Sequence, residues 1–197
     1  RNHPNVQTLL LDNSNIEFAI NILEELEKEF LSRKLLFEGL GSTISNIDKY
    51  NKNSAIKIPY HLIIIDEAQE LFTRGYEFNK KINKILTRIA KQGRAFGIHL
   101  ILCTQTFSDC KIDDAVTKQT RLRVSFRLSD GSDCRAILGR ENDAPLYLKR
   151  FQIVYNSENG LKDKNIIAKT NNFDENLIEE ILNTQKQKYR DNINFEI

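Results

Sequence analysis

The amino-acid sequence predicts an α/β fold with a mostly parallel sheet and flanking helices. Three observations support this: short apolar runs alternate with amphipathic helical patterns, the runs have strand length, and polar residues follow them. The 197 residues are enough for one domain with a substantial core. We therefore expect a single domain over residues 1–197.

The first expected elements are a short strand and a long helix. Residues 6–11 (VQTLLL) form an apolar run typical of a buried strand. Ser14 and Glu17 then have the spacing of a capping box, which marks a helix start. The helix is expected to run to about Phe37, before Gly39 interrupts it. Its apolar stripe comprises Ile16, Ile20, Leu23, Leu26 and Phe30.

The next strand ends on two adjacent acids. In residues 61–71 (HLIIIDEAQEL), four apolar residues directly precede Asp66 and Glu67. Such a run is typical of a strand buried in the core. Ligands of parallel α/β sheets bind outside the carboxyl ends of the strands. The two carboxylates are therefore expected at an edge of the sheet where sites are built.

A second amphipathic helix and another strand follow. Residues 78–92 place Phe78, Ile82, Ile85, Leu86 and Ile89 on one face. Residues 98–105 (IHLILCTQ) then form an apolar strand that ends on Gln105. If both strands are parallel neighbours, Gln105 lies close to the two acids.

The later part of the chain has weaker patterns. Residues 121–128 (RLRVSFRL) alternate strictly, which predicts a strand buried on one face only. Leu122, Val124, Phe126 and Leu128 are expected on the buried face. A short helix (132–138), a hairpin-like segment (151–160) and a closing helix (about 173–189, capped by Asn172) complete the expected elements.

Composition excludes several classes of protein. Lys plus Arg at 29 nearly balances Asp plus Glu at 27, so a nucleic-acid site would have to be a local patch. No apolar run has the length of a membrane span, and no signal peptide is visible. The three cysteines (Cys103, Cys110 and Cys134) show no CxxC spacing, which favours reduced cytosolic thiols over disulfides or zinc. Because the chain begins at Arg1 and lacks methionine, we expect a piece of a longer protein.

A buried strand that ends in Asp-Glu is the pattern of the Walker B motif of ATPases. In that chemistry Asp66 would orient the water shell of Mg²⁺, and Glu67 would polarise the water that attacks the γ-phosphate of ATP. Gln105 would hydrogen-bond that water or the phosphate. An acidic turn without function is the alternative, since short motifs also arise by chance. The phosphate-binding pattern GxxxxGK[ST] does not occur in this sequence.

Four blocks of the sequence resemble, in order, successive blocks of the FtsK/SpoIIIE family of motor ATPases. They read INILEELEKEFLSRKLLFEGLGSTISNIDKYN, PYHLIIIDEAQEL, ILTRIAKQGRAFGIHLILCTQ and TRLRVSFRLSDGSDCRAIL. The resemblance covers about residues 6–140, and 141–197 are weakly characterised. It implies a partial RecA-like P-loop NTPase core whose N-terminal P-loop portion is absent from this chain.

The resemblance also implies roles for single residues. Asp66 and Glu67 would be the Walker B pair that serves ATP and Mg²⁺, and Gln105 would be the sensor. Arg94, in KQGRAFGIHL, is similar to the family arginine that reaches into a neighbouring subunit's nucleotide. By position alone, Arg94 also suits the cap of a helix C-terminus. Members of the family form rings, usually hexamers, that pull a polymer through the central hole.

The polymer differs between the two broad groups of the family, double-stranded DNA translocases and the motors of type VII protein secretion. After the sensor, translocases carry Arg-Pro-Ser, whereas this chain has residues 106–108 as TFS. The segment expected to face the pore, 109–116, has only Lys111 against three aspartates, which repel phosphates. Residues 73–81 (TRGYEFNKK) suit DNA better through Arg74, Lys80 and Lys81, although a solvated helix start explains them equally.

We therefore expect part of an ATP-hydrolysing ring motor that translocates double-stranded DNA in a bacterial cytoplasm. Membrane contact is expected only through segments outside this chain. A secretion motor that moves protein substrates is the first alternative. A degenerate domain that assembles without hydrolysis is the second, although the intact Glu67 argues against it.

Overall fold

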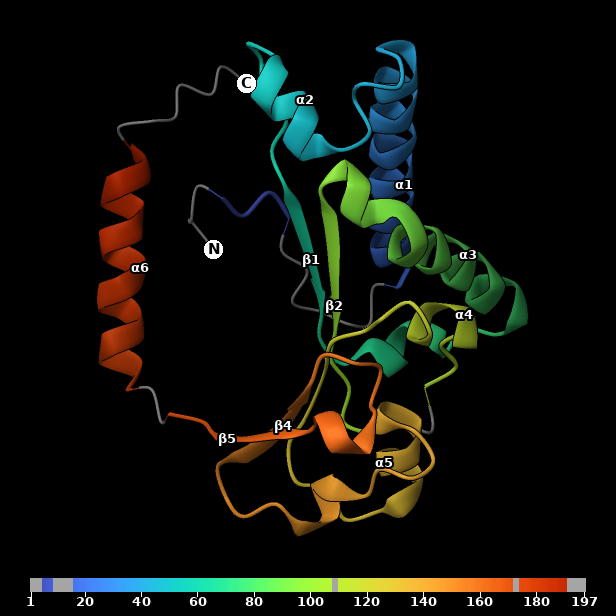
Figure 1. Cartoon of the computed structure of the whole chain (residues 1–197), viewed down its shortest axis with the longest axis vertical. Coiled ribbons are helices and arrows are strands. Elements are labelled where there is room, and N and C mark those ends of the chain that lie inside the picture. The colour runs from blue at the N-terminus through green and yellow to red at the C-terminus, as the bar shows by residue number, and fades with distance from the viewer. Residues whose placement is uncertain (1–4, 9–15, 108–109, 172–173, 191–197) are drawn as a thin grey trace.

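The computed structural model describes residues 5–8, 16–107, 110–171 and 174–190 (Figure 1). Two sheets organise this part of the chain, a parallel pair (β1-β2) and an antiparallel sheet with the order β3-β4-β5. The helices are α1 (Ile16–Gly39), α2 (Ile47–Asn53), α3 (Tyr76–Gln92), α4 (Asp114–Thr117), α5 (Gly131–Leu138) and α6 (Glu175–Arg190). The strands are β1 (His61–Ile65), β2 (Ile98–Leu102), β3 (Arg123–Ser125), β4 (Gln152–Asn156) and β5 (Ile166–Lys169). Short 3₁₀ turns are η1 (Ala68–Phe72), η2 (Gly93–Phe96), η3 (Ala144–Tyr147) and η4 (Lys162–Lys164).

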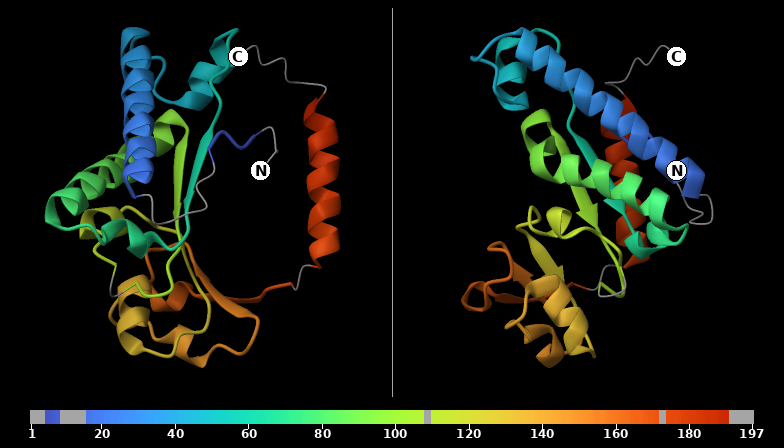
Figure 2. Two further views of the ribbon diagram at one scale, coloured as in Figure 1. Left: turned by 180° about the vertical axis from the view of Figure 1, so that it is seen from behind. Right: turned by 90° about the vertical axis from the view of Figure 1, so that its right-hand side faces the viewer.

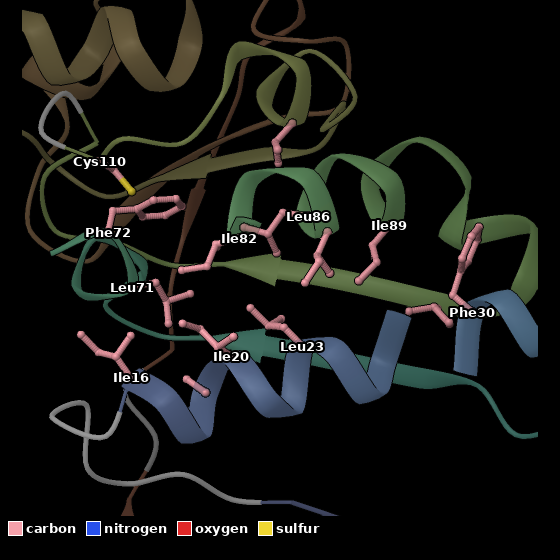
Figure 3. Packing of buried hydrophobic residues seen from close by; sticks show 14 residues of the cluster. Ile16, Ile20, Leu23, Phe30, Leu71, Phe72, Ile82, Leu86, Ile89 and Cys110 are labelled. Atoms are coloured by element: carbon pink, nitrogen blue, oxygen red, sulfur yellow. The ribbon is translucent and has the colours of Figure 1, made fainter. Parts of the chain in front are cut away.

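Helices α1 and α3 cover one face of the parallel sheet and form the main core with it (Figure 3). Both helices contain the predicted apolar stripes, and Ile82 and Leu86 of α3 are fully buried. The prediction is wrong for Phe78, which lies in the first turn of α3 and is 39% exposed. Ile63 and Ile65 of β1 pack against this cluster from the sheet. Burying these aliphatic side chains supplies the main stabilising free energy of this half of the chain.

Strands β1 and β2 are parallel neighbours in register, with His61 opposite Ile98 and Ile65 opposite Leu102. The prediction that the whole apolar run of β1 is buried is wrong for one face of this strand. Leu62 and Ile64 are 60% and 62% exposed, because α1 and α3 lie on the other face. The expected closing helix is confirmed as α6, which begins two residues later than predicted. Helix α6 stands apart from the parallel sheet on the side opposite α3 (Figure 1).

The antiparallel sheet and α5 form a smaller unit beyond the carboxyl ends of β1 and β2 (Figure 2). The predicted strand 121–128 is reduced to β3, and its predicted facing is wrong. Val124 and Phe126 are exposed, whereas Ser125 is buried. The half-buried Arg123 explains the inversion, because its guanidinium donates to the carbonyls of Thr117, Thr120 and Ile137. The face of β3 that carries Arg123 and Ser125 therefore packs toward the ends of α4 and α5.

Other expected elements differ in extent. Strand β4 pairs with β5 across a longer connection than the predicted hairpin of 151–160. Residues 6–8 form no strand, while the rest of the expected strand 6–11, Ser14 and Asn172 lie outside the described residues. None of the helices in the described ranges is both long enough and apolar enough to span a membrane.

Candidate functional site

The two acids lie between backbone hydrogen bonds that continue the pairing of β1 with β2. The Cys103 amide donates to the Ile65 carbonyl, and the Ala68 amide donates to the Cys103 carbonyl, both at 2.8 Å. Glu67 has left-handed backbone angles (φ 50°, ψ 49°), which are uncommon for a residue with a side chain. The bend directs the chain out of the strand into η1. Strain of this kind clusters at functional sites.

The Glu67 carboxylate is engaged through both of its oxygens. Gln105, three residues past the end of β2, donates from Nε2 to Oε1 of Glu67 at 2.5 Å. Gln69 of η1 donates from Nε2 to the other oxygen, also at 2.5 Å. Thr104 in turn donates its hydroxyl to Oε1 of Gln69. The carboxyl edge of the parallel sheet therefore holds one connected polar network.

Asp66, Glu67 and Gln105 are thus brought together, as the sequence predicted from the parallel arrangement. Gln69 and Thr104 were not predicted as site residues. Their sequence signal was their position, since Gln69 follows Glu67 by two residues and Thr104 directly precedes Gln105. Nothing in a single sequence shows that these two side chains meet, because they are 35 residues apart.

The carboxylate of Asp66 is exposed and accepts a hydrogen bond from the Glu67 amide at 3.0 Å. Within the described residues, no group of three or more His, Cys, Asp or Glu side chains is placed to hold a metal ion. Mg²⁺ in nucleotide sites is commonly held by one or two carboxylates together with phosphates and water. Asp66 fits an ion that arrives with a nucleotide, and not a metal cage made by this chain alone.

Cys103 lies beside Asp66 at the same edge. Partial burial raises the pKa of the Cys103 thiol, and the Asp66 carboxylate raises it further. Burial raises the pKa of Cys110 to about 11. Both thiols therefore stay protonated at neutral pH, and neither supplies a thiolate nucleophile or metal ligand.

Arg94 lies at the opposite edge of the sheet. It belongs to η2, four residues before β2 begins, whereas Gln105 follows the end of β2. The five residues of β2, at about 3.3 Å each, separate the two edges by roughly 16 Å. The exposed Arg94 lines a polar pocket with Ser45, Asn46, Asp48, Tyr60, Ala95 and His99. Within one chain, Arg94 and Glu67 therefore belong to different sites.

Two of the cations predicted for nucleic acid are paired with carboxylates of α1. Arg74 lies 3.2 Å from Glu17, and Lys81 forms an ion pair with Glu24. These pairs offset part of the charge that a phosphate would meet. The ammonium of Lys80 lies 6.0 Å from the centre of the Tyr76 ring.

Asn83 of α3 joins this helix to the segment that was expected to face a pore. Its amide donates to the Lys111 carbonyl at 2.9 Å, and its oxygen accepts from the Asp113 amide at 2.8 Å. The exposed Lys111 therefore lies close to α3. Asp113 caps α4 by accepting from the Ala115 amide, so this carboxylate has a structural role.

The architecture and the acidic edge of the parallel sheet define the class of protein, a RecA-like P-loop NTPase core. Among solved structures, the pCW3 conjugation coupling protein TcpA, in its monomer form with ATPγS, aligns with a TM-score of 0.72 and 22% identity. The alignment covers 89% of this chain and 49% of TcpA. EssC (ATPases 2 and 3) from Geobacillus thermodenitrificans aligns with a TM-score of 0.68 and 20% identity, over 93% of this chain and 34% of EssC.

The particular family follows from sequence comparison. The model of the FtsK/SpoIIIE family matches residues 4–109, and the chain belongs to this family, as its sequence blocks predicted. The DNA translocase FtsK of Borreliella burgdorferi is 33% identical over 138 residues, which are 70% of this chain and 17% of that protein. The ESX secretion system protein YukB of Bacillus subtilis is 30% identical over 149 residues, which are 71% of this chain and 9% of that protein. The chain thus spans less than a fifth of the length of either relative.

Proposed function

We propose that this chain is the part of an ATP-driven ring motor that carries the hydrolytic carboxylate, and that the motor translocates double-stranded DNA. The separation of Arg94 from Glu67 is the observation that carries the proposal. An arginine at the opposite edge of the sheet serves a γ-phosphate only if that phosphate is bound by another subunit. A closed ring places each subunit's Arg94 edge against its neighbour's Glu67 edge. The family's rings, usually hexamers, suit this arrangement.

In the proposed motor, each residue at the carboxyl edge of the parallel sheet has its own role in ATP hydrolysis. Bound Mg²⁺-ATP supplies the γ-phosphoryl group and the positive charge that polarises it. Asp66 orients the water shell of the ion, and Glu67 accepts a hydrogen bond from the attacking water. Gln105 and Gln69 hold the Glu67 carboxylate in a defined orientation. Arg94 of the adjacent subunit offsets the charge that develops on the phosphate.

Double-stranded DNA is supported as the substrate by the similarity to translocases named FtsK. Lys80 of α3 and Lys111 supply cations for a local patch, since Asn83 holds the segment of Lys111 against α3. Arg74 and Lys81 contribute less, because each is paired with a carboxylate of α1. A protein substrate is the second candidate, because YukB is named as an ESX secretion system protein. In addition, three aspartates (109, 113 and 114) surround Lys111 in the sequence. The intact Glu67 and its polar network argue against an assembly module that does not hydrolyse ATP. The proposed place of action is the bacterial cytoplasm, with membrane contact through other segments of the longer protein.

A mixture of two inactive variants tests the proposal. In the full-length protein, Arg94→Ala and Glu67→Gln should each abolish turnover while leaving the subunits folded and able to bind ATP. In mixed rings, some interfaces pair an intact Arg94 with an intact Glu67, so ATPase activity should return. If mixed rings form and remain as inactive as either variant, Arg94 does not act between subunits.

A further inference from the structure

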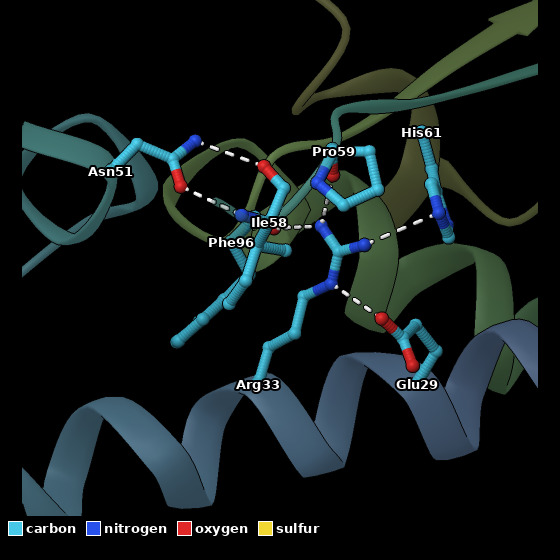
Figure 4. Close-up of polar contacts among 7 residues, drawn as sticks. All are labelled: Glu29, Arg33, Asn51, Ile58, Pro59, His61 and Phe96. Atoms are coloured by element: carbon cyan, nitrogen blue, oxygen red, sulfur yellow. Dashed lines mark hydrogen bonds and ion pairs between the residues drawn. The ribbon is translucent and has the colours of Figure 1, made fainter. Parts of the chain in front are cut away.

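A buried arginine of α1 connects this helix to the 3₁₀ turn that carries Arg94 (Figure 4). The Arg33 side chain is only 2% exposed. Its Nη1 atom donates to the carbonyl of Phe96 at 2.8 Å and to the carbonyl of Pro59 at 2.9 Å. Phe96 is the last residue of η2, and Pro59 precedes β1. One guanidinium therefore fixes the end of the turn relative to both the helix and the sheet.

The charge of Arg33 is compensated within the same cluster. Its Nε atom donates to the carboxylate of Glu29, one helical turn earlier, at 2.7 Å. The Nη2 atom lies 3.2 Å from Nε2 of His61 at the start of β1. A buried guanidinium is tolerated when its nitrogens are hydrogen-bonded, and each of the three nitrogens of Arg33 has a partner. The planar fork of donors reaches several acceptors at once, whereas a lysine ammonium offers only a compact point charge.

The backbone of η2 is held from its other sides as well. The Phe96 ring packs edge-on against Phe30 at 5.1 Å and stacks on Phe37 at 5.4 Å. Gly97 follows with φ +73°, and a Cβ there would lie 2.2 Å from the Ile47 side chain. The turn is therefore held closely against its surroundings, while the Arg94 side chain that it carries is exposed.

We propose that Arg33 is a positioning residue for Arg94. Phe96 is two residues from Arg94 within a single 3₁₀ turn, so any shift of the Phe96 carbonyl also moves the Arg94 backbone. A displacement of about 1 Å is enough to cost a catalytic group roughly a hundredfold in rate. The inference rests on the proposed function, in which Arg94 serves the nucleotide of a neighbouring subunit.

The first experiment replaces Arg33 by lysine in the full-length protein and measures kcat, the KM for ATP and the melting temperature. Arg33→Lys should lower kcat by about tenfold to a hundredfold. The KM for ATP should change by less than about twofold, since the subunit's own nucleotide site is intact. An unchanged kcat in the folded variant would overturn the inference.

Arg88→Lys is the matched control. Arg88 of α3 forms an ion pair with Glu27 of α1, so this change also weakens an arginine–glutamate contact of the same helix. Neither partner contacts η2 in this way, and kcat should stay close to the wild-type value. An equal loss of kcat in both variants would indicate a general effect on α1 and overturn the inference.

A mixing experiment separates positioning of Arg94 from damage to the subunit's own site. Arg33→Lys leaves Glu67 intact, so mixed rings with Glu67→Gln should exceed the mean activity of the two variants. If Arg33 instead supports Glu67 through β1, no activity returns. If mixing with Glu67→Gln restores activity to Arg94→Ala but not to Arg33→Lys, Arg33 has no positioning role. If mixing restores ATPase activity to neither variant, the proposed function itself is wrong.

A second variant covers the case in which Arg33→Lys does not fold. The double change Glu29→Gln with Arg33→Gln removes both charges of the pair and leaves amide groups in the cluster. Its mixed rings with Glu67→Gln should regain activity in the same way. Failure to regain activity, while the Arg94→Ala mixture succeeds, would overturn the inference.

Discussion

The side-chain amide of Gln105 donates a hydrogen bond to the Glu67 carboxylate across the ends of two neighbouring strands. The second oxygen of Glu67 accepts from Gln69, so both oxygens already have an amide donor. Each oxygen has a further lone pair, so an attacking water can bind the carboxylate beside these donors. In the proposed motor, contact of Gln105 with a γ-phosphate would release one oxygen of Glu67, which couples nucleotide binding to activation of the base.

Glu67→Gln in the full-length protein should retain ATP binding and lose hydrolysis. The amide cannot act as a proton acceptor, and general-base catalysis contributes about 10² to 10⁴-fold to rate. Single-turnover hydrolysis and the dissociation constant for ATP are the measurements. Glu70→Gln, at an exposed position of η1, is the control and should leave turnover unchanged. Unchanged turnover in Glu67→Gln would support the acidic-turn interpretation.

This 197-residue chain alone should not bind ATP measurably. The backbone amides and lysine of a P-loop make most of the phosphate contacts, and the sequence contains no GxxxxGK[ST] pattern. Asp66 provides a single carboxylate for Mg²⁺ and cannot replace these contacts. Titration calorimetry with ATP and Mg²⁺ measures this directly. A micromolar dissociation constant would reveal a nucleotide site that does not depend on a P-loop.

Duplex DNA of any sequence should stimulate the ATPase of the full-length protein, and DNA binding should weaken steeply with salt. Phosphate contacts carry no sequence information and release counterions. Lys80→Gln and Lys111→Gln should each reduce the salt slope by about one. Lys28→Gln on α1, where Lys28 pairs with Glu25, is the control and should leave the slope unchanged. Absence of stimulation at low salt would favour a protein substrate.

The stability of the domain should fall as the pH decreases below about 6.5, the ordinary pKa of His61. Burial lowers the pKa of His61, and the Arg33 guanidinium lowers it further. Arg33 donates toward Nε2, so that nitrogen accepts and the proton lies on Nδ1. Because the unfolded chain binds the additional proton more readily, the free energy of unfolding decreases with falling pH.

Denaturant unfolding between pH 5 and pH 8 measures this dependence. His61→Gln, compared with His99→Gln at an exposed position of β2, should flatten the pH profile below about pH 6.5. Equal profiles for both variants would show that His61 does not determine this dependence. Nδ1 of His61 is buried and has no hydrogen-bond partner among the described residues.

Local patterns of the sequence were enough to predict the secondary elements around the site. The apolar stripes of 16–37 and 78–92 became α1 and α3, because a helix needs only side chains three and four residues apart to form one face. The meeting of Glu67 and Gln105 also followed, since parallel strands end at the same edge of their sheet. These features depend on short-range periodicity and on one general rule of sheet topology.

Only the tertiary structure decided which faces are covered and which charges are buried. Alternation in 121–128 indicated two unlike faces, but Arg123 is held by carbonyls of neighbouring helices and turned the apolar face outward. Arg33 reads as one more charged residue of an amphipathic helix. It is buried because its carbonyl partners, Pro59 and Phe96, come from positions 26 and 63 residues away. Such contacts form only when distant segments pack, and periodicity along one segment contains no information about them.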